Sequence, residues 1–352
     1  WPEFRGKLFQ RGLRGDIQVY RTWLHVPRKK SSVWGRLLSY LSFQVMTTLV
    51  GLFLPRADVI LAPSPPLTIG LTACLRILMG QARFAYNVQD IYPDVAIRLG
   101  VLTNRTAIRF FQRLERFVYK RSALVSVLAQ GFRQNLLRKG VPEDKIVVIP
   151  NSVDTAFVAP GAKDNPFARE HGLEKKFVVL FGGNVGLSQG LVTVLDAAER
   201  LRAHGDMLFL IAGNGAAKAR LEERAVRRGL DNVAFLPLQP QERVPGLYAS
   251  ADVCLVPLRK GIAQESVPSK ALTIMAAGRP IVASVDPASD IWRCIAEAEC
   301  GLCVAPEAPE LLAEAIEKLY SSAELRERMG ENGRRYVLRH HTRQIVADSY
   351  NA

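Results

Sequence analysis

A lysine close to the start of a predicted helix is the residue of this chain best placed to do chemistry. The stretch Glu265–Lys270 precedes an apolar helical pattern that stops at Gly278. Pro268 suits the first helical position, and Ser266 can cap the helix start. Lys270 then lies in the first turn, where the helix dipole disfavours a cation by roughly 0.3–1 kcal/mol.

A cation in that unfavourable place indicates that something negative belongs beside it. The start of a helix with a lysine next to it is a pocket for phosphate, and the Glu265 carboxylate can accept bonds from a sugar hydroxyl. The alternative is an ordinary solvated lysine on a surface helix. We predict a phosphate site at Lys270.

Two glycine-rich loops follow predicted strands and can bring backbone N–H groups close to a phosphate. Gly182-Gly-Asn-Val-Gly186 follows one strand and runs through Gln189 into a helix, and Gly213-Asn-Gly215 follows the next strand. Neither loop matches the dinucleotide pattern G-x-G-x-x-G, so a nicotinamide cofactor is not favoured. Each loop taken alone can be a purely geometric turn, but together with Lys270 they should meet at one rim of a sheet.

A third polar group comes directly off a strand in the first half, in the segment Gln89-Asp-Ile-Tyr-Pro-Asp94. Asp90, Tyr92 and Asp94 should point into a cleft, although Asp90 can instead cap the next helix. The chain holds no Asp-x-Asp and few histidines, so a metal-dependent diphosphate site is poorly supported and we expect no metal and no cofactor. Cys300 and Cys303 have metal spacing but no second Cys/His pair, so the five cysteines are interpreted as reduced residues of a cytosolic protein.

Short apolar runs alternate with helical patterns along the whole chain, which predicts an α/β protein with parallel sheets flanked by helices. We expect an N-terminal domain at 1–150, a linker at 151–174, a C-terminal domain at 175–340, and a terminal helix at 341–352 that could return to the first domain. The predicted strands of the first half are 17–22, 59–62, 83–88, 124–127 and 146–149. Those of the second half are 177–181, 207–212, 233–235, 253–256, 281–283 and 302–304.

The charge distribution separates the two halves. The formal net charge is +14, and residues 1–150 hold 23 Lys and Arg against 8 Asp and Glu, a net charge of +15. The first half should therefore face an anionic partner, either nucleic acid or acidic lipid. Its basic residues are spread over helices beside apolar faces, so we expect no nucleic acid and favour an anionic membrane surface.

The longest apolar run, Leu37–Leu54, is about 18 residues long, which is marginal for spanning a bilayer. Its hydroxyl and Gln side chains favour a helix packed on a sheet. An interfacial helix on the membrane is the second interpretation, because basic residues precede the run. A membrane-spanning helix is the third.

The motifs together resemble glycosyltransferase family 4, the retaining enzymes with the GT-B architecture, and particularly its bacterial polysaccharide-assembly branch. The resemblance rests on Gln89–Asp94, Pro150–Asp154, Phe181–Gly186, Ala212–Gly215 and Val267–Pro280. It implies two Rossmann-like doubly wound domains facing a cleft, and an N-terminal domain lacking its first strand, which would precede Trp1. The expected partners are a nucleotide-sugar donor in the second domain and a lipid-linked or oligosaccharide acceptor in the first. The expected location is cytoplasmic, peripheral on the inner face of the cell membrane.

The resemblance also implies roles for individual residues. Asp90, Glu265 and Lys270 would be catalytic, and Tyr92 and Asp94 would bind the acceptor. The donor would be held by Gly182, Gly183, Asn184, Gly186, Gln189, Gly213, Asn214, Gly215, Pro237, Ser266, Val267, Pro268, Ser269 and Thr273.

The chain departs from the family pattern at three of these positions. The second carboxylate of the E-x7-E motif is replaced by Thr273, and the family's Arg and Lys phosphate pair falls on Asn184 and Gln189. The diphosphate would then depend on Lys270, helix N-termini and backbone amides. A sugar-nucleotide epimerase of the same fold and an inactive glycosyltransferase-like scaffold are the alternatives.

Overall fold

The computed structural model describes residues 6–26, 33–80, 82–262, 268–287 and 289–351. The chain forms two compact units, and each is described by itself. Unit 1 comprises Trp1–Pro93, Leu102–Val127 and Asn135–Val147, and unit 2 comprises Asp94–Val101, Leu128–Gln134 and Val148–Ala352.

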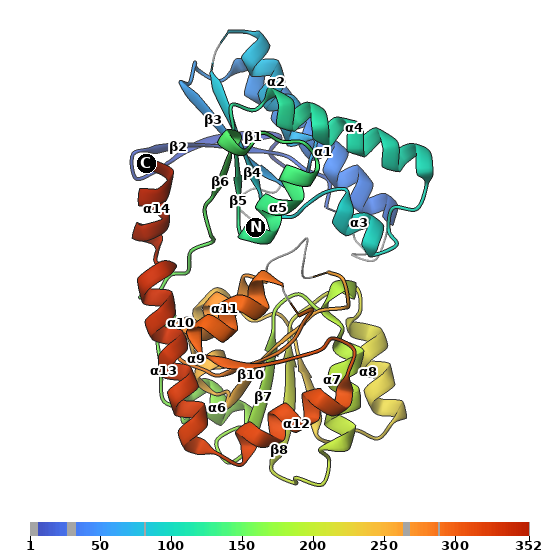
Figure 1. The fold of residues 1–352 in the computed structure, drawn as a ribbon, viewed down its shortest axis with the longest axis vertical. Helices are drawn as coiled ribbons and strands as arrows, with labels where there is room; N and C mark the ends of the chain where they lie inside the picture. The colour runs from blue at the N-terminus through green and yellow to red at the C-terminus, as the bar shows by residue number, and fades with distance from the viewer. Residues whose placement is uncertain (1–5, 27–32, 81, 263–267, 288, 352) are drawn as a thin grey trace. The chain divides into compact units, whose positions relative to one another are not determined.

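Unit 1 is built on a four-stranded sheet with the order β3-β4-β5-β6, in which β3, β4 and β5 are parallel. Helices α2 and α4 pack on this sheet (Figure 1). The elements of this part of the chain are β1 (Phe9–Arg14), β2 (Ile17–Thr22), α1 (Val33–Phe53), β3 (Val59–Ser64), α2 (Ile69–Leu78), β4 (Arg83–Val88), α4 (Arg105–Arg121), β5 (Leu124–Val127), α5 (Gln130–Arg138), η2 (Glu143–Lys145) and β6 (Ile146–Val148).

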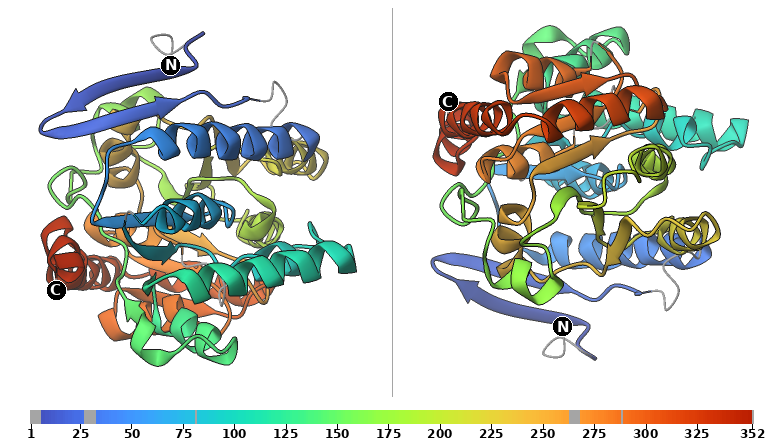
Figure 2. Two further views of the ribbon diagram at one scale, coloured as in Figure 1. Left: turned by 90° about the horizontal axis from the view of Figure 1, so that it is seen from above. Right: turned by 90° about the horizontal axis from the view of Figure 1, so that it is seen from below.

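The strand predicted at 17–22 forms, but its expected place in the parallel sheet is wrong. It is β2, and it pairs antiparallel with β1, a strand that was not predicted. The reason is the connection: Gly15, with φ of +61°, and Asp16 form a two-residue turn, whereas a parallel crossover needs a dozen residues or more. The hairpin lies along α1 (Figures 1 and 2).

The predicted helix forms as α1, and it packs mainly against helix α2 and strand β2 of the hairpin rather than on the parallel sheet. Gln44 Nε2 donates to Thr72 Oγ1 on α2 at 2.9 Å, and the hydroxyls of Thr48 and Thr72 are 2.7 Å apart. The polar side chains of α1 therefore join it to α2. Within the described residues, none of the helices combines the length and hydrophobicity needed to cross a bilayer.

An apolar stripe runs along α1 beside the side chains that contact α2. Leu38, Leu41, Val45 and Leu49 recur at helical spacing and are each about half exposed, between 48% and 57%. Phe53 continues the stripe and is 88% exposed. Within the described residues of unit 1 this stripe stays exposed, and a contiguous exposed apolar stripe is a candidate interaction surface.

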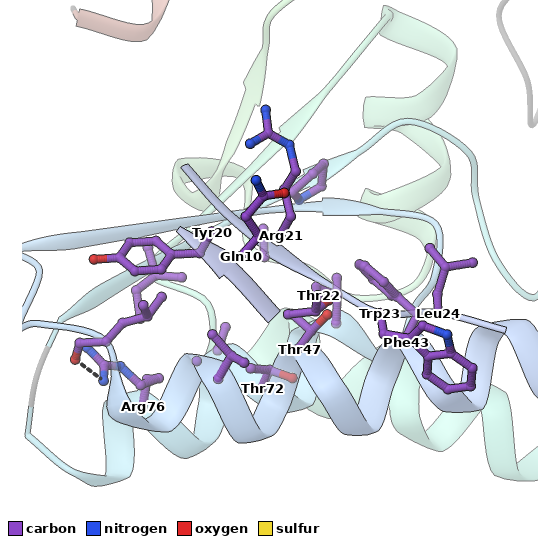
Figure 3. A pocket seen from close by; sticks show the side chains of 18 of the residues that line it. Gln10, Tyr20, Arg21, Thr22, Trp23, Leu24, Phe43, Thr47, Thr72 and Arg76 are labelled. Atoms are coloured by element: carbon purple, nitrogen blue, oxygen red, sulfur yellow. Dashed lines mark hydrogen bonds between the residues drawn. The ribbon is translucent and has the colours of Figure 1, made fainter. Parts of the chain in front are cut away.

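An apolar groove of about 1360 Å³ lies between the hairpin, α1, α2 and the outer edge of β3. Figure 3 shows Gln10, Tyr20 and Arg21 of the hairpin above α1 and α2. Arg76 lines the groove, but its guanidinium donates to backbone carbonyls, among them Pro55 O at 2.7 Å. The groove is lined by unit 1 alone and is separate from the glycine-rich loops of unit 2.

Unit 2 is a six-stranded sheet with the order β12-β11-β10-β7-β8-β9, and its strand pairs are parallel. The six strands predicted for the second half are confirmed, with ends that differ by at most a few residues. The elements of unit 2 are α3 (Asp94–Arg98), α6 (Pro166–His171), β7 (Phe177–Gly182), η3 (Leu187–Gln189), α7 (Leu191–Arg200), β8 (Met207–Ala212), α8 (Lys218–Arg227), β9 (Val233–Leu236), η4 (Gln241–Arg243), α9 (Val244–Ala249), β10 (Val253–Pro257), α10 (Lys270–Ala276), β11 (Ile281–Ser284), α11 (Asp290–Ala298), β12 (Gly301–Val304), α12 (Pro309–Tyr320), α13 (Ala323–His340) and α14 (Arg343–Asn351).

The core of unit 2 has two halves, one on each face of the sheet. Along β7, Phe177, Val179 and Phe181 are buried in one half, and Val178 and Leu180 are buried in the other. This alternation is that of a strand covered on both faces. Helices α7 and α12 cover the first face, and α9, α10 and α11 cover the second.

The predicted linker includes packed structure. Helix α6 forms within it, and Phe167 and Ala168 are buried in the core of unit 2. Val153 N donates to His341 O at 2.9 Å, so the segment after β6 is tied to the turn between α13 and α14. The Phe157 amide and the Arg343 guanidinium hold the pKa of Asp154 below its usual value.

Candidate functional site

The order of strands in unit 2 places its ligand crevice. Strands β8 and β9 lie on one side of β7, whereas β10, β11 and β12 lie on the other. After β9 the chain therefore crosses back over the sheet and adds its remaining strands on the other side of β7. The strand order reverses between the neighbours β7 and β10. In open parallel sheets, ligands bind outside the carboxyl ends of the strands at this point. The loop after β7 begins at Gly183, and the segment after β10 leads to α10 and Lys270.

The two glycine-rich loops are in backbone contact, as predicted. Val185 N donates to Asn214 O at 3.0 Å. A Cβ on Gly213 would lie 1.8 Å from Gly183 O, and one on Gly215 would lie 2.2 Å from Val185 O. Glycine is therefore required at 213 and 215 because no side chain fits between the loops.

Two backbone amides of the segment Gly182–Gly186 are already bonded within the fold. Gly183 N already donates to Ala212 O at 2.9 Å, and Val185 N donates to Asn214 O. A donor amide that is bonded within the fold cannot also bind a phosphate without breaking that bond. Gly182 is the last residue of β7, so the amides of Asn184 and Gly186 remain as candidates in the loop itself.

Lys270 is the first residue of α10 and is partly buried next to the loop after β7. Its ammonium donates to Gln189 Oε1 at 2.5 Å and lies 3.8 Å from the centre of the Phe181 ring. A Cβ on Gly183 would be 3.8 Å from Lys270 Nζ, so the cation borders the first loop. Burial lowers the pKa of Lys270 to about 7, because removal from water disfavours the charged form.

Helix α10, which carries Lys270, packs against α13. A Cβ on Gly330 would lie 2.1 Å from Gly278 O, just beyond the end of α10. Gly278 has φ of +65°, which confirms the predicted stop signal. Arg334 of α13 donates to Ala276 O at 2.9 Å and to Thr155 O at 3.0 Å. These contacts hold α10 against the body of unit 2.

The predicted start of α10 is wrong by two residues. The helix begins at Lys270, and Ser269 precedes it without a side-chain cap bond. Ala271 N donates to Pro268 O at 3.1 Å, so Pro268 begins the preceding turn. Thr273 is a partly buried residue of α10. Glu265, Ser266 and Val267 lie outside the described residues.

Lys218 is a structural residue that the sequence analysis missed. It starts α8, as Lys270 starts α10, yet its ammonium donates to Gly213 O at 3.0 Å and Leu236 O at 2.7 Å. It therefore fastens the second glycine-rich loop to the end of β9. The sequence signal of both lysines is the same, and only their partners distinguish them.

The remaining predicted site residues belong to other loops. Pro237 is exposed just after β9, and Asn214 is exposed between the two glycines of its loop. Asp90 and Tyr92 lie beyond β4 in unit 1, and Asp94 begins α3. Since α3 begins at Asp94, Asp90 lies too early in the chain to cap it. The roles of Asp90, Tyr92 and Asp94 toward an acceptor stay predictions.

Metal-binding side chains do not gather in the part of the chain that the structure describes. No group of three His, Cys, Asp or Glu is arranged there to hold an ion. Burial raises the pKa of Cys254 to about 12, and the other four cysteines are likewise free thiols.

The two halves of the chain match two known sequence families. Residues 4–152 match the glycosyl transferase 4-like domain, and residues 164–336 match glycosyl transferases group 1. WcaI of Escherichia coli (strain K12), named as a colanic acid biosynthesis glycosyl transferase, is 30% identical over 318 residues, which are 86% of this chain and 76% of WcaI. The glycosyltransferase WbjE of Pseudomonas aeruginosa is 31% identical over 75% of this chain and 66% of its own length.

Among solved structures, the Anabaena protein Alr3699/HepE in complex with UDP has a TM-score of 0.68 at 16% identity, covering 90% of this chain and 82% of its own. This likeness shows the fold, and the two-domain GT-B architecture that the sequence predicts is confirmed. The chain therefore has the GT-B fold of glycosyltransferases, with glycine-rich loops where the strand order of the second sheet reverses. The chain belongs to glycosyltransferase family 4, in the polysaccharide-assembly branch that the motifs resemble, and it is a transferase.

Proposed function

We propose that this protein transfers a sugar, with retention of configuration and without a metal ion, from a nucleotide-sugar donor to a lipid-linked saccharide acceptor in cell-surface polysaccharide synthesis. The observation that carries this proposal is the Lys270 ammonium beside Gly183, at the switch point of the sheet. It lies where a diphosphate would meet the ends of β7 and β10. The name of WcaI, which refers to colanic acid biosynthesis, supports a role in polysaccharide synthesis. The complex of HepE with UDP supports a nucleotide-sugar as the donor.

In the proposed reaction the protein supplies position and charge, not a nucleophile. The bond between the sugar and the diphosphate breaks, and an oxocarbenium-like centre forms. A phosphate oxygen takes the proton of the acceptor hydroxyl as that hydroxyl attacks from the same face. Lys270 stabilises the charge that develops on the leaving diphosphate. Glu265 contacts the hydroxyls of the donor sugar, and Asp90 orients the acceptor hydroxyl.

The donor nucleotide can be tested by a thermal-shift panel with UDP, GDP, ADP and TDP. One of these should raise the melting temperature, because a ligand at 100 times its Kd stabilises the folded state by about 2.7 kcal/mol. Sugar nucleotide incubated with the protein but no acceptor is the companion measurement. Interconversion of the sugar without acceptor would instead identify an epimerase, and no shift with any nucleotide would contradict the donor site.

The lipid part of the proposal rests on unit 1. The apolar stripe Leu38, Leu41, Val45 and Leu49 lies on α1, and residues 1–150 carry a net charge of +15. A helix with an exposed apolar face in a basic body is suited to an anionic membrane surface. We place the protein in the cytoplasm, at the inner face of the cell membrane.

Purified protein is expected to sediment with phosphatidylglycerol vesicles at low salt and to be released at high salt, because salt screens the charge attraction. Paired substitutions Val45→Asp and Leu49→Asp should reduce this sedimentation several-fold. The control is Val226→Asp, at an 80% exposed position on α8 of unit 2. Equal binding to neutral vesicles, or no effect of the α1 substitutions, would contradict the proposal.

A further inference from the structure

Within the described residues, Gln189 is a hydrogen-bond partner of the Lys270 ammonium. It ends η3, and its side-chain oxygen accepts the hydrogen bond from Lys270 Nζ at 2.5 Å. The two residues lie 81 positions apart in the sequence. Because the acceptor is a neutral amide, the bond fixes the direction of the ammonium without cancelling its charge.

The turn that carries Gln189 is tied to the chain leading to Lys270. Arg259 N donates to Ser188 O at 2.9 Å. Gly190 follows with φ of +58°, and a Cβ there would lie 3.3 Å from the backbone carbon of Leu258. The turn that carries Gln189 and the residues directly after β10 are therefore packed together.

Two further neighbours of the ammonium among the described residues, Phe181 and Gly183, are uncharged. The Phe181 ring lies on one side at 3.8 Å, and the backbone of Gly183 lies on another. The loop after β7, η3 and the rest of α10 contain no titratable side chain. On the segment before α10 the charged residues are Arg259, Lys260 and Glu265; Arg259 faces Glu307 at 3.8 Å, and Glu265 lies outside the described residues.

We propose that Gln189 is a positioning residue that holds the Lys270 ammonium over Phe181 and beside Gly183, ready for the donor diphosphate. The inference rests on the proposed function, in which Lys270 binds that diphosphate. An amide at 189 orients the cation and leaves its charge for the ligand. A carboxylate at 189 would pair with the cation and repel the diphosphate, and an alanine would leave a desolvated ammonium without an acceptor.

Proton uptake follows from this arrangement. With a pKa of about 7, Lys270 is mostly neutral at pH 8 and largely protonated at pH 6. A bound diphosphate favours the protonated form, so binding at pH 8 takes up a proton. The affinity for the nucleotide should therefore fall as the pH rises through 7.

The test is titration calorimetry with the nucleoside diphosphate that the thermal-shift panel selects. Measurements at pH 8 in two buffers of different ionisation enthalpy give the number of protons taken up. The wild-type protein should take up on the order of one proton per nucleotide. Lys270→Met should abolish this uptake, and Gln189→Ala should weaken binding about 10-fold.

The decisive measurement is the double variant. If Gln189 acts through Lys270, adding Gln189→Ala to Lys270→Met should weaken binding by no more than about 2-fold. Gln189→Glu keeps the side-chain size, and it should move the pH dependence to higher pH because a carboxylate raises the pKa of Lys270. Gln241→Ala, on exposed η4, is the matched control and should bind as the wild type does.

Two results would overturn the role of Gln189 alone: wild-type binding by Gln189→Ala, or an equal loss whether or not Lys270 is present. Wild-type affinity and proton uptake in Lys270→Met would instead remove the phosphate role of Lys270, and with it the proposed function of this site. The melting temperature of each variant without nucleotide shows that it is folded.

Discussion

Replacing Lys270 with alanine is expected to lower kcat/KM for donor turnover by about 10²-fold or more. The reason is that the ammonium is held at the end of β7, where the proposed reaction places the charge that develops on the leaving diphosphate. It acts from a partly buried position beside an aromatic ring, where an electrostatic contact is stronger than in water. Steady-state kinetics with the donor selected by the thermal-shift panel measures the loss.

Lys175→Ala is the control for this variant. Lys175 is an exposed residue before β7, and its removal changes the net charge equally while leaving the crevice untouched. Full activity of the Lys270 variant would contradict its role in charge stabilisation. A loss of equal size in both variants would point to the net charge of the protein instead.

Gly213→Ala is expected to abolish nucleotide binding and to destabilise the fold. The new methyl group would lie 1.8 Å from the carbonyl oxygen of Gly183, a backbone atom that cannot turn away. Overpacking of this kind costs about 1–3 kcal/mol and sometimes more. A protein of this size should therefore melt about 2–10 °C lower, as calorimetry can measure.

Gly205→Ala is the matched control because a Cβ there meets nothing within 4 Å. It should leave both the melting temperature and nucleotide binding unchanged. If Gly213→Ala bound nucleotide normally, the close contact between the two glycine-rich loops would not matter for the site.

The sequence predicted most of unit 2 because its strands are nearly continuous apolar runs buried on both faces. The first strand of the hairpin gave no such signal. In β1 four of the six residues are exposed, so neither its composition nor its alternation separates it from a loop. Its partner β2 was found, but the sheet to which it belongs depends on the short turn at Gly15.

The candidate site was predictable in part. Glycine-rich turns after two strands and the position of Lys270 are local patterns, and the structure brings them together at one edge of the sheet. The bond between Gln189 and Lys270 is a contact between distant segments, which no local pattern encodes. The local sequence pattern also did not distinguish the proposed phosphate-binding Lys270 from the structural Lys218, because both lysines start a helix that follows a strand.

The close approach of the buried Gly330 to Gly278 makes the position of α10 depend on α13, a helix outside the crevice. Any larger residue at 330 would push on the backbone just beyond α10 and so shift the element on which Lys270 is mounted. If the crevice binds a nucleotide as proposed, substitutions in α13 are expected to alter the affinity for a nucleotide that they never touch. A survey of variants confined to the rim of the crevice would overlook them.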